Sequence, residues 1–213
     1  MSRKYKGIIF DLDGVLCTTD QFHYLARKAL ADHEGIYFDE TINQRLRGVS
    51  RMESLRIVLE HTDQVYSDEA LQAFAASKNS VYRSLLERLT PSDMPADARP
   101  TLESLREKGY LLAVGSSSKN TQFILERIGL AHFFDAVADG NDITRSKPDP
   151  EVFLLAAERL RLPPAACLVV EDASAGIEAA ERGGFDAAGI GSAGHNPHAR
   201  FHLERLSQLL AVL

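Results

Sequence analysis

The chain has 213 residues, of which 45% are hydrophobic and 25% are charged, a composition typical of a soluble globular protein with a substantial core. Its length fits one large domain, or a core with a small insert. The formal net charge of −6 argues against nucleic acid or an anionic membrane as partner, because both attract basic surfaces. It does not argue against a small anionic substrate, for which a few well-placed cations suffice.

The two cysteines, Cys17 and Cys167, are far apart and match no metal-binding spacing. Cys167 opens the apolar run Cys-Leu-Val-Val, so we interpret it as a buried small hydrophobe in a reduced protein. The basic start is followed by an apolar run only at residues 8–10, which is too short for a signal peptide, and no run approaches membrane-spanning length. We therefore expect a cytoplasmic protein without a membrane partner.

Five short apolar runs, most of them too short or too β-branched for helices, are typical of buried parallel strands. They are Gly7–Phe10, Leu111–Gly115, Ala136–Ala138, Leu168–Val170 and Ala187–Ile190. Amphipathic helical stretches separate the later runs: one begins at Pro100 and ends at Gly109, and Gly129 and Gly183 end two more. This alternation predicts an α/β fold of three layers, with a parallel sheet covered by helices on both sides.

Residues 18–89 interrupt the alternation, because they contain no convincing strand pattern. Their helical patterns begin at Asp20, Arg51 and Ser67. Ser50 and Glu53 match the Ser-x-x-Glu capping box, which places a helix start directly after Ser50. Since the segment lies between the first and second strands, we predict a helical cap domain inserted into a catalytic core made of 1–17 and 90–213.

Polar side chains follow the predicted strands at their carboxyl ends, where open parallel sheets bind their ligands. In chain order they are Asp11-Leu12-Asp13-Gly14, Gly115-Ser116-Ser117-Ser118, Lys147 and Glu171-Asp172. Clustered carboxylates repel one another unless a cation lies among them, and hard oxygen ligands suit Mg²⁺. A metal there can also bridge a carboxylate and a phosphate that would otherwise repel. The pattern therefore indicates a magnesium-assisted phosphate site.

Each residue type suits one part of such chemistry. Asp11, at the strand tip, could attack phosphorus and form an acyl phosphate. Asp13 could act as general acid and base once Gly14 turns the chain. Ser116 and the amides before the next helix could hold phosphate oxygens, and Lys147 could offset the developing negative charge.

Each motif by itself also has a simpler interpretation. A lone Asp-x-Asp is a weak signal, and strand-to-helix loops often end in Asp or Ser merely to cap the helix. Lys147 alone would be a solvated surface residue. All four motifs in this order along one predicted sheet favour the chemical interpretation.

Together the motifs resemble those of the haloacid dehalogenase (HAD) superfamily. They are Phe-Asp-Leu-Asp-Gly-Val at 10–15, Gly-Ser-Ser-Ser at 115–118, Lys147-Pro148-Asp149-Pro150 and Val-Glu-Asp-Ala at 170–173. The resemblance covers nearly the whole chain and includes the superfamily's small cap. It implies a three-layer, Rossmann-like HAD core and an aspartyl phosphate. It also implies a Mg²⁺ cofactor held by Asp11, Asp13 (through its carbonyl), Glu171 and Asp172.

The cap carries basic residues that suit a phosphate ester. Two arginines flank a glycine at 46–51, and arginine offers a planar fork for phosphate beside helix amides; two exposed arginines on a turn are the alternative. Helical periodicity assigns Lys78 to the buried face of its helix, together with Leu71, Phe74, Val81 and Leu85. Lys78 could snorkel harmlessly, or point into a cleft between cap and sheet.

Further segments resemble the β-phosphoglucomutase family within the superfamily. They are Leu-Arg-Gly-Val-Ser-Arg at 46–51, Ser-Lys-Asn at 77–79, Leu-Thr-Pro-Ser-Asp at 89–93 and Ser-Ser-Ser-Lys-Asn at 116–120. This resemblance implies an isomerase that interconverts β-D-glucose 1-phosphate and glucose 6-phosphate through β-glucose 1,6-bisphosphate. The substrate- and phosphate-binding residues that it implies are Thr19, His23, Arg47, Gly48, Val49, Ser50, Arg51, Lys78, Ser116, Ser117, Ser118, Lys119, Asn120 and Lys147.

Individual roles follow from the same resemblance. Arg51 would bind the distal phosphate, while Arg47, His23 and Lys78 would shape the sugar site. Thr19 would help to position the loop that moves the general acid and base. The chain departs from the family at Arg47, where Lys is more frequent, which changes reach and geometry, and directly before Thr19, where the family has an acid.

Two other functions fit the same sequence. A sugar-phosphate phosphatase would use the same fold and machinery, because fold alone does not decide function. A non-catalytic phospholigand-binding protein is the second alternative, although it need not keep both Asp11 and Asp13. In each case we expect a monomer with a small-molecule sugar-phosphate partner and no nucleic acid.

Near the end of the chain stand His195, His198 and His202, a spacing that suggests a metal site. Asn196 and Pro197 have the character of a helix cap and first helical residue. We therefore expect the histidines to lie on a terminal helix rather than around a metal.

Overall fold

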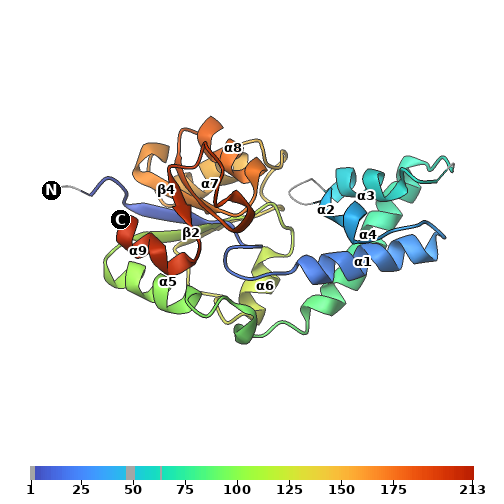
Figure 1. Cartoon of the computed structure of the whole chain (residues 1–213), viewed down its shortest axis with the longest axis horizontal. Helices are drawn as coiled ribbons and strands as arrows, with labels where there is room; N and C mark the ends of the chain where they lie inside the picture. The colour runs from blue at the N-terminus through green and yellow to red at the C-terminus, as the bar shows by residue number, and fades with distance from the viewer. Residues whose placement is uncertain (1–2, 47–50, 63) are drawn as a thin grey trace. The chain divides into compact units, whose positions relative to one another are not determined.

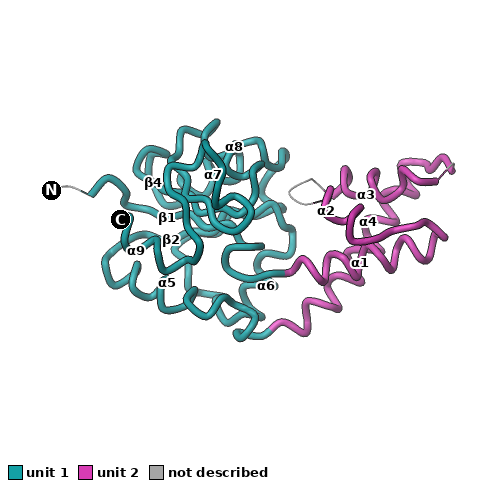
Figure 2. Tube along the Cα trace, in the orientation of Figure 1, with its two compact units in different colours: residues 1–18, 90–213 teal, residues 19–89 magenta. Residues whose placement is uncertain are grey.

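The computed structural model describes residues 3–46, 51–62 and 64–213, and the chain divides into two compact units (Figures 1 and 2). Unit 1 comprises Met1–Thr18 and Thr90–Leu213, and unit 2 comprises Thr19–Leu89. The insert expected at 18–89 thus differs by one residue from this division. No helix among the described residues is both long and apolar enough to cross a lipid bilayer.

Unit 1 contains a six-stranded sheet in the order β3-β2-β1-β4-β5-β6, in which all neighbours are parallel. Its strands are β1 (Gly7–Phe10), β2 (Leu111–Gly115), β3 (Ala136–Ala138), β4 (Cys167–Glu171), β5 (Asp186–Ile190) and β6 (Phe201–Leu203). The central strand is β1, where Phe10 lies between Val114 of β2 and Val170 of β4. The parallel α/β fold predicted from the sequence is confirmed.

Helices cover both faces of this sheet (Figure 1). The helices of unit 1 are α5 (Ala98–Glu107), α6 (Thr121–Arg127), α7 (Glu151–Arg159), α8 (Ser174–Arg182) and α9 (Leu209–Val212). Short 3₁₀ turns are η1 (Pro91–Asp93), η2 (Pro164–Ala166), η3 (Gly191–Ala193) and η4 (Leu206–Gln208). Figure 1 shows α7 and α8 on one face and α5 and α9 on the other. The apolar face predicted for α5 is buried through Leu102 and Leu105, although the helix begins two residues before Pro100.

The strand β6 corrects the expectation of a terminal helix after Asn196. The Asn196 Oδ1 accepts a hydrogen bond from the His198 N–H (3.0 Å), and the Asn196 carbonyl accepts one from the Ala199 N–H (3.0 Å). Such local bonds of asparagine compete with helix formation. The chain therefore turns, and Phe201–Leu203 pairs with β5.

Two of the three histidines of this segment contact neighbouring protein groups. His202 lies on β6, and its Nδ1 is 3.0 Å from the Gly194 carbonyl oxygen. His198 Nδ1 lies 3.2 Å from a carboxylate oxygen of Glu181. His195 belongs to a turn rather than to the predicted helix.

The described residues of unit 2 form four helices, which are α1 (Asp20–His33), α2 (Glu40–Gln44), α3 (Arg51–Leu59) and α4 (Asp68–Leu86). The three expected helix starts are found, with Ser67 capping α4 by accepting the Ala70 N–H (3.3 Å). The sequence pattern did not predict α2, which Asp39 caps by accepting the Ile42 N–H (2.8 Å). The predicted capping box involves Ser50, which lies outside the described residues.

The buried face of α4 differs slightly from the predicted stripe. Its fully buried residues are Ala75, Tyr82 and Leu86, whereas Val81 is 37% exposed. On the buried side, the aromatic ring of Tyr82 stacks on His23 with a centroid distance of 4.0 Å. Lys78 is half-buried at the edge of the face.

Candidate active site

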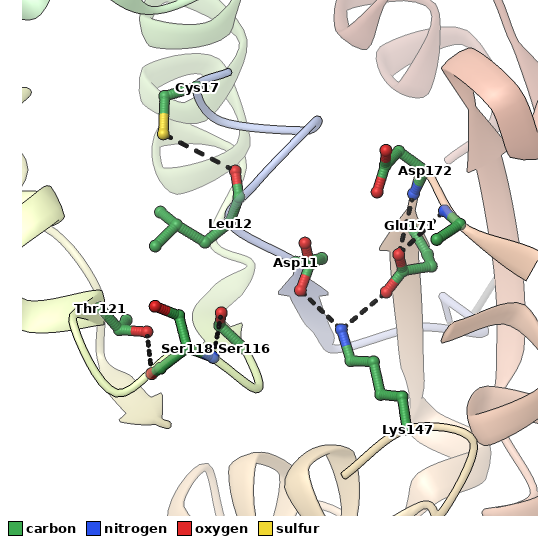
Figure 3. Close-up of polar contacts among 10 residues, drawn as sticks. Asp11, Leu12, Cys17, Ser116, Ser118, Thr121, Lys147, Glu171 and Asp172 are labelled. Carbon is green, nitrogen blue, oxygen red and sulfur yellow. Dashed lines mark hydrogen bonds and ion pairs between the residues drawn. The ribbon is translucent and has the colours of Figure 1, made fainter. Parts of the chain in front are cut away.

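The carboxyl edge of the sheet gathers the acidic residues of two neighbouring strands (Figure 3). Asp11 directly follows β1, and its N–H continues the sheet by donating to the Val170 carbonyl of β4 at 2.9 Å. Glu171 ends β4 and Asp172 follows it. Because β1 and β4 are parallel and in register, their tips meet at the same edge. Asp11 is 7% exposed and Glu171 is 1% exposed, so this edge carries buried charge.

The ammonium group of Lys147 lies between two of these carboxylates. Its Nζ is 2.6 Å from Asp11 Oδ1 and 2.7 Å from Glu171 Oε2 (Figure 3). Burial by itself lowers the pKa of Lys147, but the charges of Asp11 and Glu171 outweigh burial and raise this pKa above its ordinary value. The lysine is therefore a fixed positive charge, held in a site where an unpaired ion would be costly.

The carboxylate of Glu171 is fixed at both oxygens. Its Oε2 accepts from Lys147, and its Oε1 accepts the N–H groups of Asp172 (3.1 Å) and Ala173 (3.0 Å). Gly176 of α8 makes room for this side chain, because a Cβ at this position would collide with the Glu171 carboxylate.

Gly14 makes room for Asp172 in the same way. Its φ is +89°, a conformation that favours glycine, and a Cβ there would collide with the Asp172 carboxylate. The turn that follows Asp13 therefore requires glycine both for its backbone conformation and for the space beside the acidic residues.

The acidic residues of this edge suit a divalent cation. Asp11, Glu171 and Asp172 each offer an oxygen, and these oxygens lie within 4.8 Å of one another. Lys147 pairs with Asp11 and Glu171, and Asp172 adds a third carboxyl group. Burial raises the pKa of Asp11 to about 7 against the pull of Lys147. Burial, followed by the charges of Glu171 and Asp11, raises the pKa of Asp172 to about 9. An all-oxygen site with excess negative charge fits Mg²⁺.

These raised pKa values predict a specific dependence of stability on pH and metal. A carboxyl group whose pKa rises from 3.8 to about 9 on folding binds more protons in the folded state throughout that interval, so stability falls as pH rises through it. In buffer with chelator we expect the melting temperature to fall between about pH 5 and pH 9, and Mg²⁺ to raise it most at the alkaline end. Asp172→Asn should flatten both trends. Calorimetric scans with an unchanged melting temperature and no Mg²⁺ effect would contradict this assignment.

Among the described residues, Asp13 is not one of the three carboxylates that could hold a metal ion together, but its charge contributes to the raised pKa values of Asp11 and Asp172. It is half-buried and forms an isolated bridge with Cys17, and the next N–H, of Gly14, donates to the Cys17 carbonyl at 2.7 Å. The loop is thus a tight turn directly after Asp11. The predicted roles of Asp13, as a metal ligand through its carbonyl and as a proton carrier, remain proposals.

The segment between β2 and α6 forms a compact turn that begins at a buried serine. The Ser116 N–H donates to the Ala138 carbonyl (3.1 Å), and Ser116 Oγ accepts the Ser118 N–H (3.2 Å). Ser118 Oγ in turn accepts the Asn120 N–H (3.1 Å). Ser117 Oγ is buried and has no hydrogen-bond partner among the residues that the structure describes. Hydroxyls and amides are therefore concentrated in this turn.

The loop after β3 supports the same turn. The Gly140 N–H donates to the Ser118 carbonyl (3.0 Å), and Asn141 Nδ2 donates to the Lys119 carbonyl (3.1 Å). A Cβ at position 140 would collide with the Ser117 carbonyl. The side chain of Lys119 itself is exposed.

Unit 2 contains a second polar cluster, made of Thr19, His23, Lys78 and Tyr82, of which the first three belong to the predicted substrate-binding residues. Lys78 Nζ lies 2.9 Å from His23 Nδ1 and 4.6 Å from the centre of the Tyr82 ring. Thr19 Oγ1 lies 2.8 Å from the Tyr82 hydroxyl. Burial, together with the charge of Lys78, holds the pKa of His23 well below its ordinary value, so His23 Nδ1 can accept from the ammonium group. Tyr82 was missed, although it follows Lys78 by one helical turn.

The arginines of unit 2 have different surroundings. Arg51 Nη2 donates to Asn79 Oδ1 (3.2 Å). Arg27, which sequence analysis did not select, donates to Asn43 Oδ1 (2.9 Å), to Ser54 Oγ (3.2 Å) and to the carbonyl of residue 46 (3.4 Å). It therefore ties α1, α2 and α3 together. The predicted residues Arg47, Gly48, Val49 and Ser50 lie outside the described residues.

A parallel sheet whose acidic tip holds a buried lysine and a set of oxygens suited to a cation defines an enzyme of the phosphate-transfer class. The family model for haloacid dehalogenase-like hydrolases matches residues 5–184. The chain belongs to that family.

Known relatives include both mutases and phosphatases. The chain is 38% identical over 188 residues to a β-phosphoglucomutase of Bacillus subtilis (strain 168). The aligned part covers 87% of this chain and 83% of the relative. It is 31% identical over 191 residues to a fructose-1-phosphate phosphatase of Escherichia coli (strain K12), over 89% and 98% of the two chains. The crystal structure of a β-phosphoglucomutase from Clostridium difficile matches with a TM-score of 0.89 at 34% identity, over 96% of this chain and 93% of that one.

Proposed function

We propose that the chain is a magnesium-dependent β-phosphoglucomutase, which interconverts β-D-glucose 1-phosphate and glucose 6-phosphate. The observation that carries this proposal is the buried Lys147 ammonium between Asp11 and Glu171, in a chain 38% identical to a β-phosphoglucomutase. A nucleophilic carboxylate needs a fixed cation beside it to approach an anionic phosphoryl group. Lys147 supplies that charge from the chain itself.

In the first half-reaction, phosphorylated Asp11 donates its phosphoryl group to the 6-hydroxyl of β-glucose 1-phosphate. The bond between the Asp11 oxygen and phosphorus breaks, a bond between the sugar oxygen and phosphorus forms, and Asp13 takes the hydroxyl proton as general base. The products are β-glucose 1,6-bisphosphate and the free Asp11 carboxylate.

In the second half-reaction, the bisphosphate presents its other phosphoryl group to Asp11. The Asp11 carboxylate attacks phosphorus, the bond from phosphorus to the oxygen on carbon 1 breaks, and Asp13 returns its proton to that oxygen. Glucose 6-phosphate is released and Asp11 is phosphorylated again. Protons and phosphoryl groups balance over the cycle, with catalytic bisphosphate needed only to start it.

Other residues bind the substrate and the transferring group. Ser116, Lys147 and the amides of the turn at 116–120 would hold the phosphoryl oxygens. Asp11, Glu171, Asp172 and the Asp13 carbonyl would hold Mg²⁺, which supplies charge neutralisation for the phosphoryl group when bound. The Lys78–His23 pair supports a role in binding the sugar hydroxyls, and Arg51 would bind the distal phosphate together with the segment 47–50.

A sugar-phosphate phosphatase is the second candidate, and the 31% identity to a fructose-1-phosphate phosphatase supports it. The two activities differ in the group that accepts the phosphoryl group from Asp11, which is a sugar hydroxyl in a mutase and water in a phosphatase. A mutase must therefore keep water away from the acyl phosphate, which would otherwise hydrolyse.

An assay on both anomers of glucose 1-phosphate separates these functions. With Mg²⁺ and a trace of β-glucose 1,6-bisphosphate, we expect glucose 6-phosphate from the β anomer only, with little free phosphate. Omitting the bisphosphate should produce a lag or a loss of rate. Steady phosphate release that does not require bisphosphate would overturn the mutase proposal in favour of the phosphatase.

A further inference from the structure

The loop that carries Lys147 has no regular secondary structure between β3 and α7, over residues 139–150. Its lysine nevertheless reaches Asp11 and Glu171 at 2.6 and 2.7 Å. Sheet hydrogen bonds fix Asp11 and Glu171 but do not fix Lys147. Another interaction must therefore hold the lysine's backbone in place.

The carboxylate of Glu151, the first residue of α7, folds back onto this loop. Its Oε1 accepts the Thr144 N–H at 3.1 Å, and its Oε2 accepts the Arg145 N–H at 2.8 Å. The Thr144 hydroxyl lies 3.2 and 3.1 Å from the same two oxygens. One side chain thus binds two consecutive amides and a hydroxyl just before Lys147.

The residues that follow Lys147 form polar contacts with the residues before it and with the start of α7. The Asp149 N–H donates to the Ser146 carbonyl (3.1 Å), and Asp149 Oδ1 accepts the Glu151 N–H (3.0 Å). The Arg145 guanidinium lies 3.2 Å from Asp149 Oδ2. Lys147 therefore lies in a compact loop, and the residues on both sides of it are bonded to Glu151 at the start of α7.

The same helix start also supports the lysine side chain. Phe153, in the first turn of α7, is fully buried, and its ring centre lies 4.5 Å from Lys147 Nζ. It packs against Phe185 with a centroid distance of 6.3 Å, so the ring is anchored to the core. Glu151 thus links the loop backbone to α7, the helix that carries the Phe153 ring beside the Lys147 ammonium group.

The alternative is that Glu151 only stabilises α7 and has no effect on Lys147. An acidic side chain in the first turn of a helix stabilises it through the helix dipole without any contact with the preceding loop. In that case its removal would lower the melting temperature slightly and leave Lys147 where it is. The bonds to Thr144 and Arg145 favour a role beyond this one.

We propose that Glu151 is a positioning residue for Lys147: by binding the Thr144 and Arg145 amides it holds the loop so that the ammonium group lies between Asp11 and Glu171. The inference rests on the proposed role of Lys147 in phosphate transfer. Glu151 does not touch the reacting atoms, and it acts only through the lysine.

The test compares Glu151→Ala and Glu151→Gln with the wild type and with Glu158→Gln, an exposed glutamate on the same helix. Each protein is treated briefly with an amine-acetylating ester, and the rate of acetylation of Lys147 is followed by mass spectrometry, with exposed Lys119 as internal reference. Lys147 should be protected in the wild type and in Glu158→Gln. It should react several-fold faster in Glu151→Ala, and at an intermediate rate in Glu151→Gln, which keeps one acceptor oxygen.

Turnover provides the second measurement. A displaced lysine should lower kcat in Glu151→Ala by about 10- to 100-fold, with a smaller loss in Glu151→Gln and none in Glu158→Gln. Unchanged acetylation of Lys147 in a folded Glu151→Ala protein overturns the inference, whereas faster acetylation with unchanged kcat overturns the proposed role of Lys147 in phosphate transfer. If Glu151→Ala does not fold, the same criteria apply to Glu151→Gln. Acetylation is independent of turnover, so an inactive wild type would overturn the proposed function while the labelling still decides the role of Glu151.

Discussion

Replacing Asp11 by Asn is expected to lower kcat by roughly 10,000-fold or more, the scale of loss when a catalytic nucleophile is removed. The amide has nearly the same shape as the carboxylate and can still accept a hydrogen bond from Lys147. It cannot form an acyl phosphate under these conditions. The measurement is glucose 6-phosphate production from β-glucose 1-phosphate with Mg²⁺ and bisphosphate.

Stability distinguishes this loss from misfolding. Asp11→Asn removes a carboxyl whose charge raises the pKa of Asp172, while Lys147 keeps Glu171 as its partner, so in metal-free buffer the melting temperature of the variant should equal or exceed that of the wild type. Asp32→Asn, a change at an exposed aspartate of α1 that pairs with Lys28, provides the control and should remain active. Turnover of Asp11→Asn within about tenfold of the wild type would refute the nucleophile.

Replacing Lys147 by Met is expected to damage both activity and stability. Loss of a fixed cation at the transferring group should lower kcat/KM by roughly 100- to 1,000-fold. It also leaves the buried Asp11 and Glu171 carboxylates without their partner, and breaking a buried ion pair in this way costs about 3–5 kcal/mol of unfolding free energy. The measurements are steady-state kinetics and denaturant unfolding in metal-free buffer.

The loss of stability in Lys147→Met should grow as the pH rises. The charge of Lys147 lowers the pKa of Asp11, which burial raises, so without the lysine this pKa rises further. A carboxyl group with a raised folded pKa contributes stability at acid pH and loses it as pH rises through that pKa. The stability deficit of Lys147→Met should therefore be small near about pH 4 and large near about pH 8. Lys147→Arg keeps the charge but not the geometry, so it should recover more stability than activity. Equal stability of Lys147→Met and the wild type at alkaline pH would contradict the buried ion pairs of Lys147 with Asp11 and Glu171.

The core of the fold was predictable because its strands are short, apolar and buried on both faces. The five runs from Gly7 to Ile190 were each found as strands, with bounds shifted by at most one residue. The sixth strand, Phe201–Leu203, was not foreseen, because His202 interrupts any apolar run there and Asn196-Pro197 resembles a helix start. The helix α2 was missed because five residues are too few to show a helical period.

The gathering of Asp11, Glu171 and Asp172 at one edge was predictable, because the carboxyl ends of parallel strands lie at the same edge of a sheet. The strand order that puts β1 directly beside β4 was not predicted. Tyr82 and Glu151 could not be found in this way. The partner of Tyr82 is Thr19, 63 positions earlier, and Glu151 acts through bonds to backbone amides that leave no mark in the residue pattern.

Phosphorylation of Asp11 can be detected by mass spectrometry. The protein is mixed with Mg²⁺ and either β-glucose 1,6-bisphosphate or acetyl phosphate, quenched in acid, digested, and searched by mass spectrometry for one added phosphoryl group. We expect it on the side chain of Asp11, and on no residue of the Asp11→Asn protein. Phosphorylation at another residue, or none from either donor, would contradict the account, and the second result would favour a protein that binds phosphorylated ligands without reacting with them.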